Sequence, residues 1–263
     1  MPHSELIYKL KKYFGIDEKL LKWICSFLSG RRQRVKIGDS FSEWAEVTSG
    51  VPQGSVLAPL LFLCYVKDMQ EKQHKANVSK FADDTKLFSA IYDSNCTLQL
   101  QASLDAISEW CKKWKMPLNL NKSAVLKFER VEHAIPAYTL QGEPLRFVKD
   151  ERDLGIKMDS MLSFKPHIQD IVAKSLKLYG WMVRTLVTRE RDVVLKIYKT
   201  IIRPNLEYAS SFWNPTAAGQ IKLLEKVQRK VTKLILGKNL KYNENLQIQN
   251  LPTLKWRRHS WIF

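Results

Sequence analysis

The chain has 263 residues, with 43 Lys and Arg against 26 Asp and Glu, and a formal net charge of +17. An apolar fraction of 45% is sufficient for the core of one large or two modest domains, and it excludes an intrinsically disordered chain. The charge predicts a polyanionic partner; because no apolar run is long enough for a membrane span and no secretory signal pattern is visible, nucleic acid is favoured over a membrane.

The cysteines give no sign of a structural metal or a disulfide framework. Cys25, Cys64, Cys96 and Cys111 form no CxxC pair, and no histidine stands at zinc-finger spacing from them. Reduced thiols in an intracellular compartment, nucleus or cytoplasm, are therefore expected, and secretion is not.

Two amphipathic helices are predicted at the start of the chain. Ser4 is the expected N-cap of the first helix, which Gly15 ends, and the second helix runs from about Asp17 to Gly30. Both are expected to pack beneath a sheet.

A basic strand follows these helices. Residues 34–37 are predicted to pair across Gly38-Asp39 with residues 44–48. The arginines of this strand suit contact with nucleic-acid phosphates and also suit a solvated edge that resists aggregation, and both interpretations stay open.

The stretch from Gly50 to Gly54 predicts a loop that leads into a buried helix from Ser55 to about Met69. Glycine lets the backbone approach a ligand closely, and the start of a helix offers unpaired N–H groups to an anion. An ordinary junction capped by Ser55 is the alternative.

Two adjacent carboxylates, Asp83 and Asp84, stand between β-prone segments that predict two short strands joined by a tight turn. Like charges about 4 Å apart repel by roughly 4 kcal/mol at an effective dielectric near 20, so a counter-charge is expected. Mg²⁺ suits this pair because it takes one or two carboxylates together with water and substrate phosphates. A solvated turn is the alternative for an isolated Asp-Asp.

The rest of the chain is predicted to become increasingly helical. A helix over residues 97–115 carries aromatic side chains that are expected in the core, a strand covers 124–128, and a hairpin lies within 131–150. From Phe164 onward, apolar residues recur at spacings of three and four, which predicts a helical bundle.

One helix of this bundle has a basic face, formed by Lys226, Arg229, Lys230 and Lys233. A surface that tracks a nucleic-acid backbone fits this asymmetry, and a merely solvated face is the alternative.

Two motifs carry a family resemblance. The sequences GVPQGSVLAPLLF at residues 50–62 and FADDTK at 81–86 resemble those of reverse transcriptases from non-LTR retrotransposons of the LINE and jockey type. Similarity to that family continues at residues 110–114, 119–122, 153–156, 203–208 and 224–230.

The resemblance implies an α+β fold. Residues 1–160 would form a partial reverse-transcriptase palm, an antiparallel sheet with packed helices and a primer-grip-like end, and residues 161–263 would form a helical, thumb-like bundle. It also implies an RNA-directed DNA polymerase that uses an RNA template, a DNA primer, dNTP and two Mg²⁺ ions.

The resemblance also implies roles for single residues. Asp83 and Asp84 would be the catalytic metal ligands. The residues expected near the nucleotide or template are Gln53, Gly54, Ser55 and Lys122, and those of the primer-grip-like element are Leu154 and Gly155.

Only the tail of one family motif is present in the chain, at Met1-Pro2-His3. The family pattern Asp-x-Ser-Lys-Ala-Phe-Asp, whose first Asp is a metal ligand, would precede Met1. We therefore expect a truncated chain that does not polymerise alone and that binds two ions only if the missing carboxylate is supplied. A non-catalytic, nucleic-acid-binding remnant of such an element is the alternative function.

Overall fold

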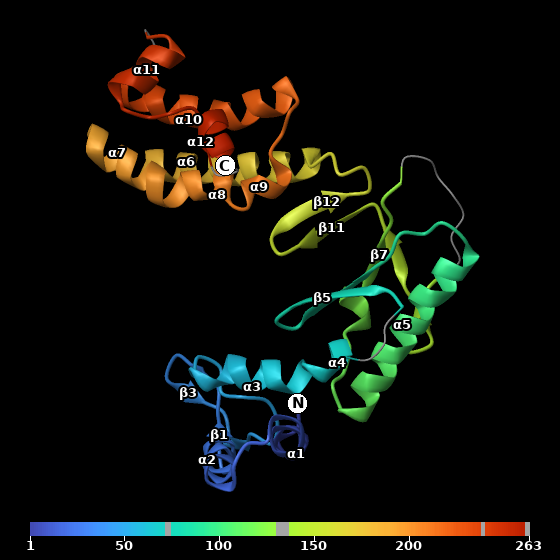
Figure 1. Ribbon diagram of the computed structural model, residues 1–263. Helices are drawn as coiled ribbons and strands as arrows, with labels where there is room; N and C mark the ends of the chain where they lie inside the picture. The colour runs from blue at the N-terminus through green and yellow to red at the C-terminus, as the bar shows by residue number, and fades with distance from the viewer. Residues whose placement is uncertain (72–74, 130–136, 238–239, 261–263) are drawn as a thin grey trace. The chain divides into compact units, whose positions relative to one another are not determined.

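The chain divides into two compact units, the first from Met1–Val125 and His133–Arg146, the second from Leu126–Glu132 and Phe147–Phe263. The computed structural model describes residues 1–71, 75–129, 137–237 and 240–260 (Figure 1). The predicted mixture of helix and strand is confirmed. The division into palm and thumb stays a prediction.

Helices and short strands make up the first unit. Its helices are α1 (His3–Phe14), α2 (Glu18–Leu28), α3 (Leu57–Val66), α4 (Asp68–Glu71), α5 (Ser94–Lys113) and the 3-10 turn η1 (Leu120–Lys122). Its strand pairs are β1 (Arg32–Gln33) with β4 (Ala45–Glu46), β2 (Lys36–Ile37) with β3 (Ser40–Phe41), β5 (Asn77–Phe81) with β6 (Asp84–Phe88), and β8 (Thr139–Leu140) with β9 (Glu143–Pro144). Strands β7 (Ala124–Leu126) and β10 (Arg146–Val148) lie where the two units divide.

The first two helices begin and end where local chemistry requires it. Asp17 caps α2, since its Oδ1 accepts hydrogen bonds from the N–H groups of Lys19 (2.8 Å) and Leu20 (3.0 Å). Gly15 ends α1 in the left-handed conformation, with φ +59°. The prediction of Ser4 as N-cap is wrong: Pro2 is the cap, so α1 begins earlier.

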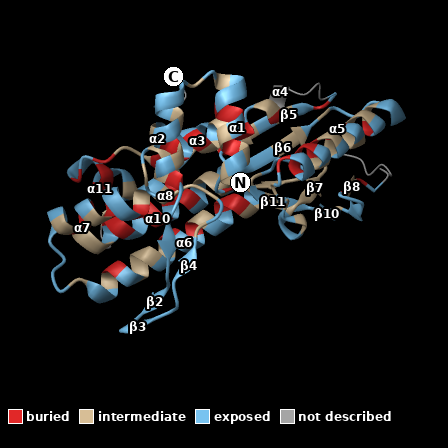
Figure 2. Cartoon of the chain, turned by 90° about the horizontal axis from the view of Figure 1, so that it is seen from below, coloured by how far each residue is buried: buried red, intermediate tan, exposed pale blue. Residues whose placement is uncertain are grey.

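The predicted basic strand is interrupted. The N–H of Val35 donates to Ser42 Oγ at 2.9 Å, so a side chain replaces a backbone acceptor between the β1–β4 and β2–β3 pairs. All residues from 31 to 46 are exposed, and Figure 2 shows the ribbon of β2 and β3 in pale blue. With no buried face, nothing enforces one continuous register.

The core of the first unit lies between α1, α2, α3 and α5. Its buried side chains include Leu6, Leu10, Ile24, Leu28, Leu61, Tyr65, Ile107, Trp110 and Trp114. The expectation that the aromatic residues of the 97–115 helix belong to the core is confirmed, since Trp110 and Trp114 are buried.

The second unit is a helical bundle with one β-hairpin, β11 (Asp150–Asp153) with β12 (Ile156–Asp159). Its helices are α6 (Lys165–Thr185), α7 (Arg191–Ile197), the π-helical turn η2 (Tyr198–Ile202), α8 (Arg203–Glu207), α9 (Ser210–Trp213), α10 (Ala218–Leu236), α11 (Tyr242–Ile248) and α12 (Leu254–Ser260). The predicted helical bundle is confirmed.

The predicted hairpin within 131–150 is confirmed in its second half. Strands β8 and β9 pair across Gln141-Gly142, while residues 130–136 lie outside the described part of the chain. The described strands form two-stranded pieces, in place of a single antiparallel sheet. Within the described ranges, no helix combines the length and apolar character needed to span a bilayer.

Candidate functional site

The two acidic residues lie at the tip of the β5–β6 hairpin. Phe81 pairs with Asp84, which leaves Ala82 and Asp83 as a two-residue turn. Ala82 has φ +52°, a left-handed conformation that alanine rarely adopts, and the positive φ at the first turn position is typical of a type II′ hairpin turn. The chain reverses directly before Asp84, so the predicted tight turn is confirmed.

The carboxylates of this turn are accessible. Asp83 and Asp84 are both exposed, so neither is a buried charge that must be neutralised by the protein itself. Across residues 1–71, 75–129, 137–237 and 240–260, no three His, Cys, Asp or Glu side chains gather closely enough to hold a metal ion. The pair alone supplies two carboxylates, which fits a Mg²⁺ ion that takes its remaining ligands from water and phosphate.

The Gln53-Gly54 turn precedes helix α3 in the same unit. Both residues are exposed, and Gly54 has φ +83°, where a side chain would be strained. Ser55 Oγ donates to the carbonyl of Pro52 at 2.8 Å and accepts from the N–H of Ala58 at 3.2 Å. Val56, and not Ser55, is the N-cap residue of α3, so the alternative of a junction capped by Ser55 is wrong. The Ser55 hydroxyl still bonds the first turn of α3 and is engaged within the protein.

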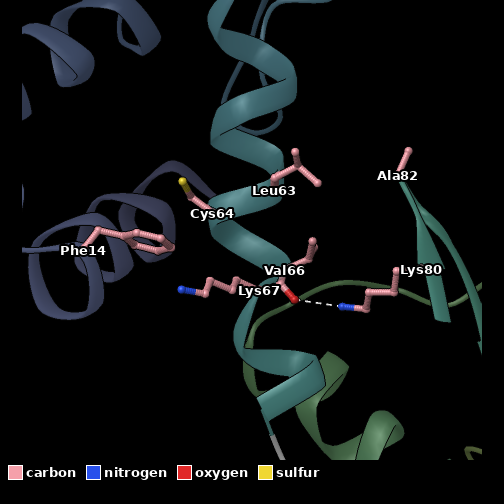
Figure 3. Close-up of a pocket in the computed structure, with 7 residues that line it drawn as sticks. All are labelled: Phe14, Leu63, Cys64, Val66, Lys67, Lys80 and Ala82. Carbon is pink, nitrogen blue, oxygen red and sulfur yellow. Dashed lines mark hydrogen bonds between the residues drawn. The ribbon is translucent and has the colours of Figure 1, made fainter. Parts of the chain in front are cut away.

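A cavity of about 360 Å³ adjoins the hairpin turn. Its lining joins the end of α1, the side of α3 and the β5–β6 hairpin, as Figure 3 shows for Phe14, Leu63, Cys64, Val66, Lys67, Lys80 and Ala82. Lys80 Nζ donates to the carbonyl of Val66 at 2.8 Å. The helix that follows the Gln53-Gly54 loop and the acidic hairpin therefore share one cavity and one hydrogen bond.

The ammonium group of Lys80 loses hydration at this position. Burial lowers its pKa to about 8, and Asp68 opposes this effect. Because the pKa of lysine in the unfolded chain is about 10.4, the folded state disfavours the charged form. The resulting destabilisation is present below pH 8 and is relieved as the pH rises from about 8 toward 10.4.

A pH-dependent difference in stability is therefore expected between the wild type and Lys80→Met. As the pH rises from 7.5 to 9.5, the wild type is expected to gain about 1 kcal/mol more unfolding free energy than the variant, a value discounted because Lys80 is only partly buried. Urea denaturation at both pH values measures this difference. Lys75→Met, at an exposed lysine, is the control, and equal pH dependence in all three proteins would contradict the prediction.

Lys122 stands at the end of the η1 turn, where it is exposed. Its N–H donates to Asn119 Oδ1 at 3.3 Å, so the asparagine shapes the turn that carries the lysine. The amine is accessible to an anion, and its role near a triphosphate stays a prediction.

The Leu154-Gly155 element is a two-residue turn between β11 and β12. Asp153 pairs with Ile156 across it, and both turn residues have positive φ, +45° for Leu154 and +86° for Gly155. The glycine therefore lies in a two-residue hairpin turn and not in a bulge within a strand.

The basic face predicted in the second unit is present on α10. Lys226, Arg229, Lys230 and Lys233 are all exposed, while Leu224, Val227 and Val231 of the same helix are buried. The guanidinium of Arg229 lies 4.6 Å from the centre of the Tyr242 ring, and Lys230 Nζ lies 5.8 Å from that of Tyr179. Both contacts hold cationic side chains along the helix surface.

Two further residues were not found by sequence reasoning. Lys9 is buried in the first unit, and its Nζ donates to Asp68 Oδ1 at 2.5 Å. Tyr208 Oη donates to the carbonyl of Leu154 at 3.0 Å. Both contacts join residues more than 50 positions apart, so no local pattern marks them; the similarity of residues 203–208 to a known family was the only signal near Tyr208.

Comparison with known proteins relates this geometry to a family. Residues 1–158 match the family model described as reverse transcriptase (RNA-dependent DNA polymerase). The chain is 32% identical over 252 residues to the probable RNA-directed DNA polymerase from transposon X-element of Drosophila melanogaster, covering 89% of this chain and 26% of that protein.

Mobile element jockey provides further relatives. The RNA-directed DNA polymerases from this element in Drosophila funebris and Drosophila melanogaster are 28% and 27% identical to the chain, which covers 27% of each, while 89% of this chain is aligned. The chain thus spans about a quarter of the length of the curated relatives it matches. The predicted resemblance to polymerases of non-LTR retrotransposons is confirmed.

The matched region covers more than half of the chain and contains both the Gln53-Gly54 loop and the Asp83-Asp84 turn. These are the two motifs whose surrounding elements line one cavity. The chain belongs to the reverse transcriptase family.

Proposed function

We propose that the chain is part of an RNA-directed DNA polymerase of a non-LTR retrotransposon, with residues 1–160 as a partial palm and 161–263 as a thumb-like region. The observation that carries this proposal is the exposed pair Asp83-Asp84 on a hairpin turn, beside a cavity shared with the helix that follows Gln53-Gly54. Accessible carboxylates on a reversed backbone suit a site for metal-bound phosphates.

The proposed reaction is attack of a primer 3′-hydroxyl on the α-phosphate of a dNTP that is paired with the RNA template. Divalent ions, when bound, help to ionise that hydroxyl and stabilise the leaving oxygen. Asp83 and Asp84 would hold these ions, and Lys122 would balance the charge of the triphosphate. Such catalysis depends on positioning and charge stabilisation, since the protein forms no covalent bond to the substrate.

The exposed loop would contact the nucleotide and the template. Gly54 has no side chain to obstruct a close approach, and the adjacent amide of Gln53 is exposed to solvent. Ser55 acts mainly by fixing the start of α3, because its hydroxyl already bonds within the loop and the helix. In the second unit, the Leu154-Gly155 turn would contact the primer strand.

Incorporation of dTMP on poly(rA)/oligo(dT) with Mg²⁺ tests the polymerase proposal. Incorporation that requires both the RNA template and the metal would support it, and incorporation independent of the template would contradict it. Binding of the template-primer without incorporation is the result expected of this chain alone. It favours the alternative, a non-catalytic nucleic-acid-binding remnant that the exposed basic face of α10 supports, if a chain extended by the family's Asp-x-Ser-Lys-Ala-Phe-Asp segment also fails to incorporate dTMP.

The basic face of α10 predicts salt-dependent binding. Changing Lys226, Arg229, Lys230 and Lys233 to glutamine is expected to weaken template-primer binding at least about tenfold near 0.15 M salt, and to reduce the slope of log K against log salt by up to about 4. Fluorescence anisotropy across a salt series measures both quantities.

A matched control removes the same charge elsewhere. Four glutamine substitutions on α1 and α2 also lower the net charge from +17 to +13 (17 − 4), at exposed lysines of the first unit: Lys11, Lys12, Lys19 and Lys22. An equal loss of affinity in both quadruple variants would mean that total charge, and not the α10 face, determines binding.

A further inference from the structure

The Leu154-Gly155 turn has a conformation that needs external support. Leu154 has φ +45°, in the left-handed region where a leucine side chain is disfavoured, and Gly155 follows with φ +86°. Only two residues join β11 to β12, so the strain is not spread over a longer loop. A contact from outside the hairpin is expected to stabilise this turn.

Tyr208 supplies that contact. Its Oη donates to the carbonyl of Leu154 at 3.0 Å, across 54 positions of sequence. A Cβ added to Gly155 would lie 3.4 Å from Tyr208 Cε1, so the edge of the ring lies against the glycine. The tyrosine thus touches both residues of the turn, the first through its hydroxyl and the second through its ring.

The tyrosine is itself held by the helices. Trp213 Nε1 donates to the carbonyl of Tyr208 at 2.8 Å, and Trp213 is only 1% exposed. The ring of Trp213 lies 5.1 Å from that of His167, whose Nδ1 accepts from the N–H of Lys157 at 3.2 Å. This series of contacts therefore begins at Leu154 in the hairpin turn and returns to the same hairpin at Lys157 of β12.

The histidine in this set is suited to accept a hydrogen bond. Burial lowers the pKa of His167, and the nearby charge of Arg152 lowers it further, while Asp170 opposes both. The bond from Lys157 requires a neutral ring whose proton is on Nε2, because only then is Nδ1 free to accept.

Tyr208 lies at the surface and outside the core cluster of the second unit. Its side chain is 58% exposed, and Leu154 is 37% exposed. A hydrogen bond at such a site adds little to the burial of apolar surface that stabilises the bundle. Its main effect is to restrict the conformations of an exposed turn.

We propose that Tyr208 is a positioning residue that holds the Leu154-Gly155 turn in the conformation required for contact with the primer strand. This inference rests on the proposed function, in which that turn contacts the primer. The hydroxyl fixes the carbonyl of Leu154, and the ring limits the space beside Gly155. The backbone at the turn is thereby ordered before nucleic acid binds, which reduces the entropic cost of binding.

Tyr208→Phe tests the hydroxyl without removing the ring. Hydrogen exchange at Gly155 and Ile156, measured without nucleic acid, is expected to become about fivefold faster, as for a lost surface hydrogen bond. The Kd for a recessed primer on an RNA template is expected to rise about threefold or more. Binding of single-stranded RNA and the thermal midpoint are expected to stay unchanged, and a general loss of structure would change both.

Tyr92→Phe is the matched control, because it removes a hydroxyl from an exposed tyrosine of the other unit. Unchanged exchange at the turn in Tyr208→Phe would overturn the proposal, as would faster exchange with an unchanged primer-template Kd. The primer contact itself is refuted if the wild type binds primer-template and single-stranded RNA with equal affinity. The positioning role then fails as well, even if Tyr208→Phe speeds hydrogen exchange at the turn.

Discussion

Asp83→Asn is expected to abolish iron-directed cleavage of the backbone near the Ala82-Asp83 turn and to lower any template-dependent extension at least about 10³-fold. Fe²⁺ bound in place of Mg²⁺ generates hydroxyl radicals when peroxide is added, and these cut the chain close to the ion. With dTTP and template-primer present, cleavage is expected within residues 80–86 of the wild type. Fragment masses measure it.

The physical reason is the loss of an anionic ligand. An amide oxygen carries no net charge, so the substitution would remove one of the two negative charges that the turn offers to a divalent cation. Asp83 and Asp84 are exposed, and the side chain of Asp83 makes no fold-stabilising bond within the described part of the chain, so the variant is expected to keep its thermal midpoint. The loss would then belong to metal binding.

Asp39→Asn is the matched control. Asp39 also occupies a two-residue hairpin turn, between β2 and β3, and it is exposed like Asp83. Cleavage near residues 38–40 of the wild type, or cleavage near 82–83 that persists in Asp83→Asn, would show that iron binds any exposed aspartate. In that case, the assignment of the metal site to this hairpin is wrong.

Much of the site was predictable because its signals are local. The positions of the β5–β6 turn and of the junction before α3 follow from residue types within a few positions of each other, although Val56, and not Ser55, is the N-cap of α3. The type of the turn was less predictable, since Ala82 adopts a left-handed conformation for which glycine or asparagine is the usual choice.

The parts that sequence reasoning missed depend on contacts over long distances in the chain. The continuous strand predicted at residues 34–37 fails because Ser42 Oγ takes the hydrogen bond of Val35, and periodicity alone does not show such an exchange. Helical spacing predicts Trp110 in the core, but it does not predict that Lys9 lies against Trp110 there. A lysine next to Leu10 is ordinarily expected at the surface.

Lys9→Ala is expected to destabilise the first unit by about 3 to 5 kcal/mol. Its Nζ donates to Asp68 Oδ1 at 2.5 Å and to the carbonyl of Tyr65 at 2.7 Å. The same nitrogen lies 3.8 Å from the centre of the Trp114 ring, 4.4 Å from that of Trp110 and 4.7 Å from that of Tyr65.

The size of the effect follows from what the alanine would leave behind. Asp68 would lose its cation, the carbonyl of Tyr65 would lose its donor, and the three rings would face a void. Burial lowers the pKa of Lys9 while Asp68 opposes this, so the ammonium depends on its partners for the stability of its charge. Urea denaturation followed by tryptophan fluorescence measures the loss.

Two variants separate the ion pair from general damage to α1. Lys11→Ala, at an exposed lysine of the same helix, is expected to change stability by no more than about 0.5 kcal/mol. The double variant Lys9→Met, Asp68→Leu is expected to recover most of the loss, because an apolar pair of similar volume removes both charges together. A double variant no more stable than Lys9→Ala would contradict this explanation, because neither removing the unpaired carboxylate nor refilling the void would then recover stability.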